Sequence, residues 1–177
     1  MMKSEFERLI GKEISQENYK VVETVYAHHS LISDVEGKKQ VESLYNQFGL
    51  GIFHDMLPHA EAQMELDRSI RMFKNMLDEE TRHETLQENT VRFHEELRKE
   101  VSLEKRPEIT RKLATAEEGL LKAQKERARL ETLLNECVNL KKALTSRTAG
   151  AYDVKKHAIA LRQAEVDLGT IRKECAF

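Results

Sequence analysis

The strongest pattern in this chain lies in residues 109–144, which read ITRKLATAEEGLLKAQKERARLETLLNECVNLKKAL. Positions at alternating spacings of four and three form one stripe: Ile109, Leu113, Ala116, Leu120, Ala123, Arg127, Leu130, Leu134, Cys137, Lys141 and Leu144. Such heptads are typical of a helix whose side chains insert between those of a facing helix. A single helix has no compact core of its own, so this one must pair with another part of the chain or with a partner. The stretch therefore predicts one long helix of a coiled coil.

One further helix is expected before this stripe and one after it. Pro58 suits the first turn of a helix, and Pro107 disfavours helix in the residue before it. Asp153 suits an N-cap, and the short link that precedes it favours an antiparallel hairpin. The expected helices, at about 58–105, 108–146 and 153–175, form an elongated helical coiled-coil region over residues 58–177.

The helix expected over 58–105 leaves one question open. Its apolar residues fall into two groups, which are Leu66, Ile70, Phe73 and Leu77, and then Leu86, Thr90, Phe93, Leu97 and Val101. Residues 78–85 between the groups read DEETRHET and include no apolar side chain. The sequence therefore does not settle whether this helix is continuous through 78–85.

Residues 1–57 are expected to form a small helical head. A first short helix ends near Gly11, and Ser15 can cap the next one. Ser33 and Glu36 fit a capping box, in which each side chain satisfies a backbone donor of the other. Val41, Leu44, Tyr45 and Phe48 then follow at helical spacing towards Gly49. The predicted architecture is all-α: a small helical head followed by a long antiparallel coiled-coil hairpin or three-helix ribbon.

The composition agrees with long helices and little sheet. The chain has 177 residues, of which 34% are charged, with no Trp, 2 Pro and 7 Gly. It includes no apolar run long enough to span a membrane, and its start lacks the apolar stretch of a signal peptide. Cys137 and Cys175 fall on expected core positions and are interpreted as reduced thiols. We therefore expect a cytoplasmic protein without a membrane partner.

Residues 141–162, here called the basic segment, concentrate positive charge on a chain whose net charge is −2. Six basic residues stand against Asp153 alone: Lys141, Lys142, Arg147, Lys155, Lys156 and Arg162. At the tip of a hairpin they would attract nucleic-acid phosphates or an acidic protein groove. Incidental charge on a solvated turn explains them equally well. Apart from Tyr152 the segment offers no aromatic residue for base stacking.

Motifs that would carry catalysis or hold a metal are weak. Glu80 and His83 form one half of the motif that di-iron helical bundles use twice, and no second half is placed on a matching helix. The pairs His28–His29 and His54–His59 are interpreted as helix-end cations that complement the helix dipole. Nucleophile motifs, phosphate-binding glycine loops and Cys-x-x-Cys pairs are missing. We therefore expect neither an enzyme nor a bound metal or cofactor.

Three stretches of the head resemble small proteins encoded by phages and prophages of Gram-positive gut bacteria. They are EFERLIGKEIS at 5–15, NYKVVETVY at 18–26 and DMLP at 55–58. The resemblance, over about residues 4–60, implies a non-enzymatic accessory protein in the host cytoplasm. Such a protein would bind and inhibit or redirect a host protein or ribonucleoprotein, as anti-CRISPR proteins do. Two alternatives are a nucleic-acid-binding protein that uses the basic segment, and a self-associating coiled-coil scaffold or homodimer.

Overall fold

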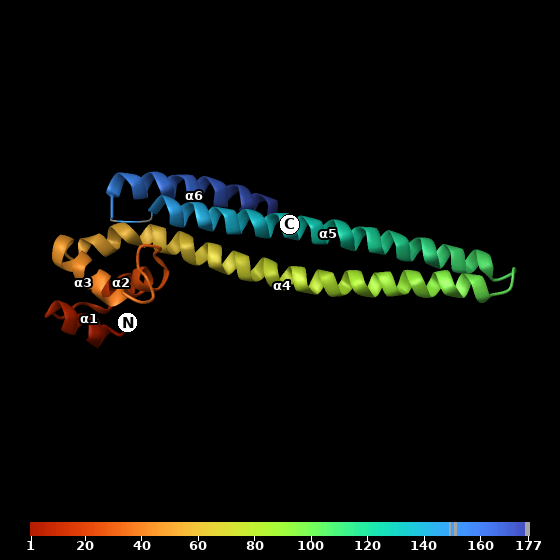
Figure 1. Cartoon of the computed structure of the whole chain (residues 1–177), viewed down its shortest axis with the longest axis horizontal. Coiled ribbons are helices and arrows are strands. Elements are labelled where there is room, and N and C mark those ends of the chain that lie inside the picture. Colours follow the sequence, from red (N-terminus) through yellow and green to blue (C-terminus); the bar gives the residue numbers. More distant parts are fainter. Residues whose placement is uncertain (149, 151, 176–177) are drawn as a thin grey trace. The chain divides into compact units, whose positions relative to one another are not determined.

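The computed structural model describes residues 1–148, 150 and 152–175, and for residues 171, 172, 174 and 175 the backbone alone. The described residues form six helices and no strand (Figure 1). The helices are α1 (Lys3–Ile10), α2 (Gln16–His28), α3 (Gly37–Phe48), α4 (Gly51–Glu100), α5 (Arg106–Thr148) and α6 (Val154–Cys175). The all-α prediction is confirmed.

The two longest helices, α4 and α5, pack closely as an antiparallel hairpin, so the heptad helix is paired as expected. The hairpin that the sequence favours turns at the link before Asp153, between α5 and α6, and the sequence does not single out α4 as the partner. The chain divides into two compact units. The first comprises Met1–Arg68 with Cys137–Phe177, and the second comprises Ser69–Glu136. The predicted division into a helical head at 1–57 and an elongated coiled-coil region at 58–177 stays a prediction.

Helix α4 begins at Gly51, seven residues before the predicted start at Pro58. A proline inside a helix loses one backbone hydrogen bond and costs about 3 kcal/mol. The turns that precede Pro58 carry Ile52, Phe53 and Met56, which are buried in the first unit. Each such side chain contributes about 1.5–3 kcal/mol when fully buried. Their burial outweighs the cost of Pro58, so the helix extends back to Gly51.

Helix α4 is continuous through residues 78–85. Polar groups pair along this part of the second unit: Glu84 Oε2 lies 3.2 Å from Arg127 Nε on α5. The hydroxyl group of Thr81 donates a hydrogen bond to the Leu77 carbonyl. Charged and polar partners thus replace the apolar seam over these two turns.

The head core is assembled from α1, α2, α3 and the first turns of α4. Phe6 is fully buried, and its ring makes edge contacts with Tyr45 and Phe53 at centroid distances of 6.0 and 5.9 Å. Ser15 caps α2 as predicted, because its hydroxyl group accepts from the Asn18 N–H. The capping box is half right, since Ser33 accepts from the Glu36 N–H while Gln40 accepts from the Ser33 N–H.

The buried stripe of α5 follows the predicted seam up to Leu130 and then broadens. Leu133 and Leu140 are buried, whereas their predicted neighbours Leu134 and Lys141 are only partly covered. An ammonium group resists burial and the leucine next to it does not, which favours Leu140 over Lys141. The thiol of Cys137 is buried as expected, and the Cys175 side chain lies outside the described part of the chain.

The second predicted apolar group of α4 does not form a core. Leu86 is 64% exposed and Phe93 is 59% exposed. In the second unit, α4 instead presents Gln87 to α5, where its side chain reaches within 3.0 Å of the position that a Cβ on Gly119 would occupy. In this part of α4, the face that packs against the seam of α5 is therefore polar, and the predicted apolar residues Leu86 and Phe93 lie on another face.

Candidate functional site

A hollow of about 380 Å³ opens on the first unit and is here called the α3 hollow. Apolar side chains line one part of it: Leu31, Leu44, Phe48 and Tyr152. Polar side chains from α3 and the turn before it line the rest: Glu36, Lys39, Gln40, Ser43 and Gln47. Its volume lies within the range of small-ligand sites, about 300–1,000 Å³. The hollow therefore has room for one small group with both apolar and polar edges.

Phe48 and Tyr152 meet at this hollow although 104 positions separate them in the sequence. Their ring centroids are 6.3 Å apart at an interplanar angle of 64°. Phe48 ends α3, because Gly49 turns the chain away with a φ of 74° while its N–H bonds to the Tyr45 carbonyl. The Phe48 ring stays 49% exposed, which its predicted place in an apolar stripe did not anticipate. The sequence gives no signal for this aromatic pair.

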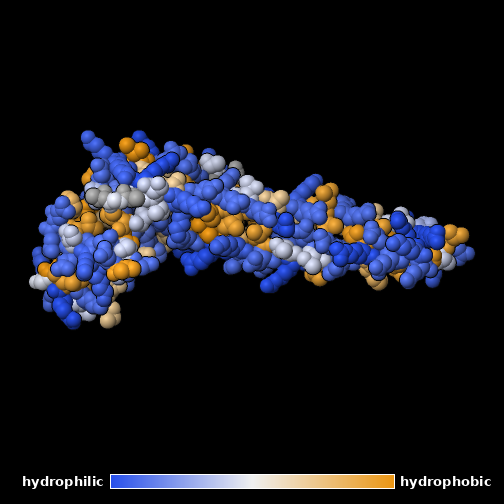
Figure 2. Space-filling model, in the orientation of Figure 1, coloured by the Kyte–Doolittle hydropathy of each residue, from blue (hydrophilic) through white to orange (hydrophobic). Residues whose placement is uncertain are grey.

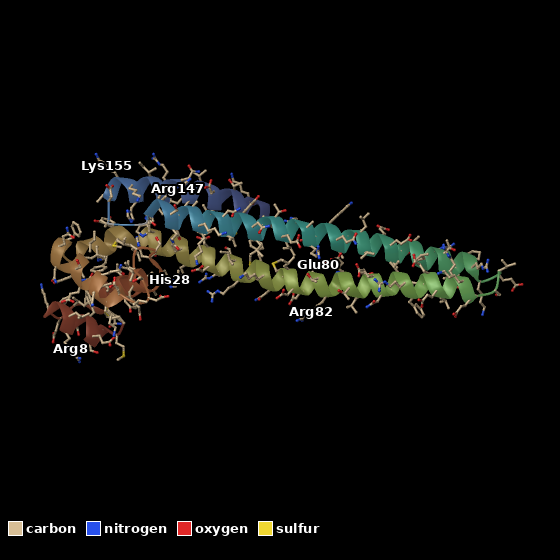
Figure 3. The ribbon with its side chains drawn as sticks, in the orientation of Figure 1. Arg8, His28, Glu80, Arg82, Arg147 and Lys155 are labelled. Atoms are coloured by element: carbon tan, nitrogen blue, oxygen red, sulfur yellow. The ribbon has the colours of Figure 1, made fainter. Side chains whose placement is uncertain are left out.

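Five of the six predicted basic residues are exposed: Lys142, Arg147, Lys155, Lys156 and Arg162. They lie on the last turns of α5 and the first turns of α6, and Figure 3 shows Arg147 and Lys155 near the ends that the link joins. Lys141 differs from them, because its ammonium group forms an ion pair with Asp67 on α4. Its charge is therefore largely compensated within the protein.

The basic segment is tied to the head rather than standing free. The hydroxyl groups of Thr148 and Ser30 are 2.5 Å apart, and Thr148 is fully buried. Thr148 also donates to the Leu144 carbonyl at 2.8 Å, so Ser30 is the donor between the two hydroxyls. At the start of α6, an Asp153 carboxylate oxygen accepts from the Lys156 N–H at 2.8 Å. The Thr148–Ser30 contact thus ties the end of α5 to the head, and Tyr152 of the same segment lines the α3 hollow against Phe48.

Three histidines from separate segments form a buried cluster in the same unit. His29, His59 and His157 are 2%, 2% and 3% exposed. Their ring centroids lie 5.2 to 5.6 Å apart, and the Tyr152 ring lies 4.8 Å from that of His157. The interpretation of His29 and His59 as helix-end cations was wrong, because tertiary packing removes both rings from water.

Burial keeps this cluster neutral at ordinary pH. It lowers the pKa of His29 to about 3, with the nearby rings of His59 and His157 adding to the effect. Burial and the neighbouring His157 lower the pKa of His59 to about 4. The pKa of His157 is also lowered, mainly by burial, against a raising effect from its bond to the Asp153 carbonyl. A charged imidazole would lose its hydration here and gain no counter-ion among these rings.

The hydrogen bonds of the cluster assign its tautomers. His157 Nδ1 lies 2.8 Å from the Asp153 carbonyl and donates to it, so its Nε2 carries a lone pair. His29 Nδ1 accepts from the Leu31 N–H at 3.1 Å, so its Nε2 carries the proton. A ring that presents N–H cannot ligate a metal through that atom. Among the described residues, no group of three or more His, Cys, Asp or Glu is placed to hold a metal ion.

Glu80 and His83 form a local pair within α4. His83 Nδ1 lies 3.1 Å from a Glu80 carboxylate oxygen, and its Nε2 lies 3.2 Å from the Gln87 amide nitrogen. The His83 side chain is 52% exposed. These contacts join side chains three and four residues apart, so they stabilise helix α4 at the surface of the second unit.

Comparison of the chain with family models, with curated proteins and with solved structures found no match. Over the described residues, no helix combines the length and the apolar character that crossing a membrane requires. The functional assignment therefore rests on the α3 hollow and the basic segment of this chain.

Proposed function

We propose that this chain is a non-catalytic accessory protein that binds a polyanionic surface of a host protein or ribonucleoprotein. One observation supports this most directly: five cations are exposed on the end of α5, which Thr148 ties to Ser30 of the head, and on the start of α6. They are Lys142, Arg147, Lys155, Lys156 and Arg162. Cations fixed on a rigid support lose less conformational freedom on binding than cations on a mobile tip. The groups around the α3 hollow are amides, a hydroxyl group, aromatic rings, an ammonium group and the Glu36 carboxylate, which together can hydrogen-bond to and stack on a bound group.

The phage-type context of the proposal comes from the resemblance of residues 4–60. In this proposal the protein acts in the host-cell cytoplasm and inhibits or redirects its partner. An anti-CRISPR-like inhibitor is the sharpest version, because CRISPR effectors are ribonucleoproteins that hold RNA in positively charged channels. A basic surface would compete for the same phosphates.

The test uses charge reversal with a matched control. Arg147→Glu, Lys155→Glu and Lys156→Glu together should lower the salt concentration at which the protein elutes from immobilised heparin, because each removed cation reduces counter-ion release. The control is Arg92→Glu, Arg98→Glu and Lys99→Glu on α4, which changes the net charge equally at exposed positions of the second unit. Equal effects of the two triple variants would mean that net charge rather than the basic segment governs binding.

The partner itself can be sought with the same variants. Bait protein in a bacterial lysate should retain a partner with wild type and with the control triple variant, and lose it with the basic-segment variant. Nuclease treatment before capture distinguishes a protein partner from one held through RNA. Retention of the same partner by all three proteins would refute the proposed surface.

Self-association is a second candidate, favoured by Leu86 and Phe93. They lie one heptad apart on α4 and are 64% and 59% exposed. Figure 2 shows apolar patches within the mostly hydrophilic surface of α4 and α5. A second copy that covered these side chains would give a mass that rises with concentration in sedimentation equilibrium. Phe93→Glu should then restore the monomer mass, and a constant monomer mass of wild type would exclude this candidate.

A further inference from the structure

The first unit places aromatic rings and cations beside one another. Phe48 is 49% exposed at the α3 hollow, and Tyr152 shares its lining. Tyr152 opens the run that leads into Lys155 and Lys156, and Lys39 lines the hollow from α3. Aromatic rings next to a cationic path are the combination that proteins use to bind single-stranded nucleic acid.

The polar lining suits the edges of a base. Gln47 offers an amide that can donate and accept, and Ser43 offers a hydroxyl group. Lys39 can pair with a phosphate, and Glu36 can accept from an exocyclic amine. An acidic peptide would pair with Lys39 and leave the Phe48 ring without a flat partner. The lining thus fits a heterocyclic base better than a carboxylate.

The tyrosine stays a neutral ring at ordinary pH. Burial raises the pKa of the Tyr152 phenol, and the negative charge of Asp55 adds to the shift. A neutral phenol does not repel phosphates. The opposing charges near the hollow and the link are the carboxylates of Asp55, Glu36 and Asp153. The five exposed cations of the basic segment, with Lys39, outnumber these three carboxylates.

We infer that the α3 hollow binds an unpaired base of a single-stranded nucleic acid whose phosphates follow the basic segment. This inference rests on the proposed function and deepens it, because it names the part of a polyanionic partner that the protein recognises. Bases within a duplex are stacked on both faces and cannot enter a hollow lined by Phe48 and Tyr152. Single strands are therefore bound more tightly than duplexes of equal length.

The test is fluorescence anisotropy with a labelled oligocytidine, whose bases carry an exocyclic amine, and a labelled RNA duplex of equal length, at two salt concentrations. Phe48→Ala should weaken binding of the single strand about ten-fold, which is the usual range for one stacked base. Phe48→Tyr should retain the affinity. Binding of the duplex should be weaker and should not change with Phe48→Ala.

The matched control is Phe93→Ala, which removes an exposed phenylalanine from α4 in the second unit. It should leave the affinity for the single strand unchanged. Lys39→Ala supplies a second variant that keeps every aromatic ring, and it should weaken the single-strand complex and reduce its dependence on salt. Far-UV circular dichroism checks that each variant is folded.

The outcomes separate this inference from the proposed function. If duplex and single strand bind equally and both lose affinity on reversal of the basic segment, the base-binding inference is wrong and the polyanion proposal stands. Unchanged single-strand affinity in Phe48→Ala, or an equal loss in Phe93→Ala, also overturns the inference. Failure of the single strand to bind overturns the inference, and failure of the heparin test overturns the proposal independently.

Discussion

Acidification from pH 7.5 to pH 5 should destabilise the first unit through its buried histidines. In the folded protein the pKa of His29 is about 3 and that of His59 is about 4, whereas an imidazole in the unfolded chain has a pKa of about 6.5. The folded state therefore binds fewer protons than the unfolded state below pH 6.5. Stability from these groups is complete above pH 6.5 and falls as the pH drops towards the folded pKa values.

The size of the effect follows from this difference. At pH 5 the unfolded imidazole is almost fully protonated and the folded cluster is still neutral, so each ring costs about 2 kcal/mol. His29 and His59 together lower the free energy of unfolding by about 4 kcal/mol. The lowered pKa of His157 acts in the same direction. Carboxylates with lowered pKa, such as Glu5 and Glu108, lose their contribution mainly below this window.

The assay is urea denaturation followed by far-UV circular dichroism at both pH values and constant ionic strength. His59→Leu removes one titrating ring, so its loss between pH 7.5 and pH 5 should be about 2 kcal/mol smaller than that of wild type. The control is His54→Gln, an exposed position on the same helix, which should keep the full loss. A wild-type protein equally stable at both pH values, or a His59→Leu variant as acid-sensitive as wild type, would refute the reasoning.

Two further predictions concern stability. Leu130→Asp should lower the free energy of unfolding by about 3 kcal/mol or more, because it places a carboxylate at a buried seam position. Glu117→Ala, at an exposed position of the same helix, should change it by less than about 0.5 kcal/mol. Equal effects of the two substitutions in urea denaturation would show that Leu130 does not lie on the buried face of α5. Gly169→Ala should raise the free energy of unfolding by about 1 kcal/mol, since nothing lies within 4 Å of the new Cβ and alanine favours helix. Gly49→Ala should lower it, because Gly49 has a φ of 74°, and thermal denaturation that ranked the two variants the other way would contradict this.

Local patterns in the sequence account for much of the fold. The heptads of α5 predict a long helix that must pair, although they do not name α4 as its partner, and Ser15 and Gly49 mark helix ends where the structure has them. Buried Leu113, Ala116 and Leu130 lie on the predicted seam. These features depend on residues within one or two helical turns, so a linear pattern is enough to find them. The cations of the basic segment are likewise visible as a run of sequence.

Helix bounds and buried faces are harder to predict, because local helix signals compete with the free energy of burial, which is of similar size. Pro58 favours a helix start, and only the burial of Ile52, Phe53 and Met56 in the head core extends α4 to Gly51. Leu86 has the spacing of a core residue and is nevertheless exposed, because the partner helix selects another face. Periodicity alone does not state which of two faces a partner will cover.

The sequence by itself determined the helices, their hairpin and the basic segment, because each depends on neighbours along the chain. Only the tertiary structure brought His29, His59 and His157 together and set Phe48 against Tyr152 at the α3 hollow. Each of these groups joins segments that lie far apart in sequence. Their burial, and with it the lowered pKa of the histidines, arises from packing in three dimensions, for which a single sequence carries no local signal.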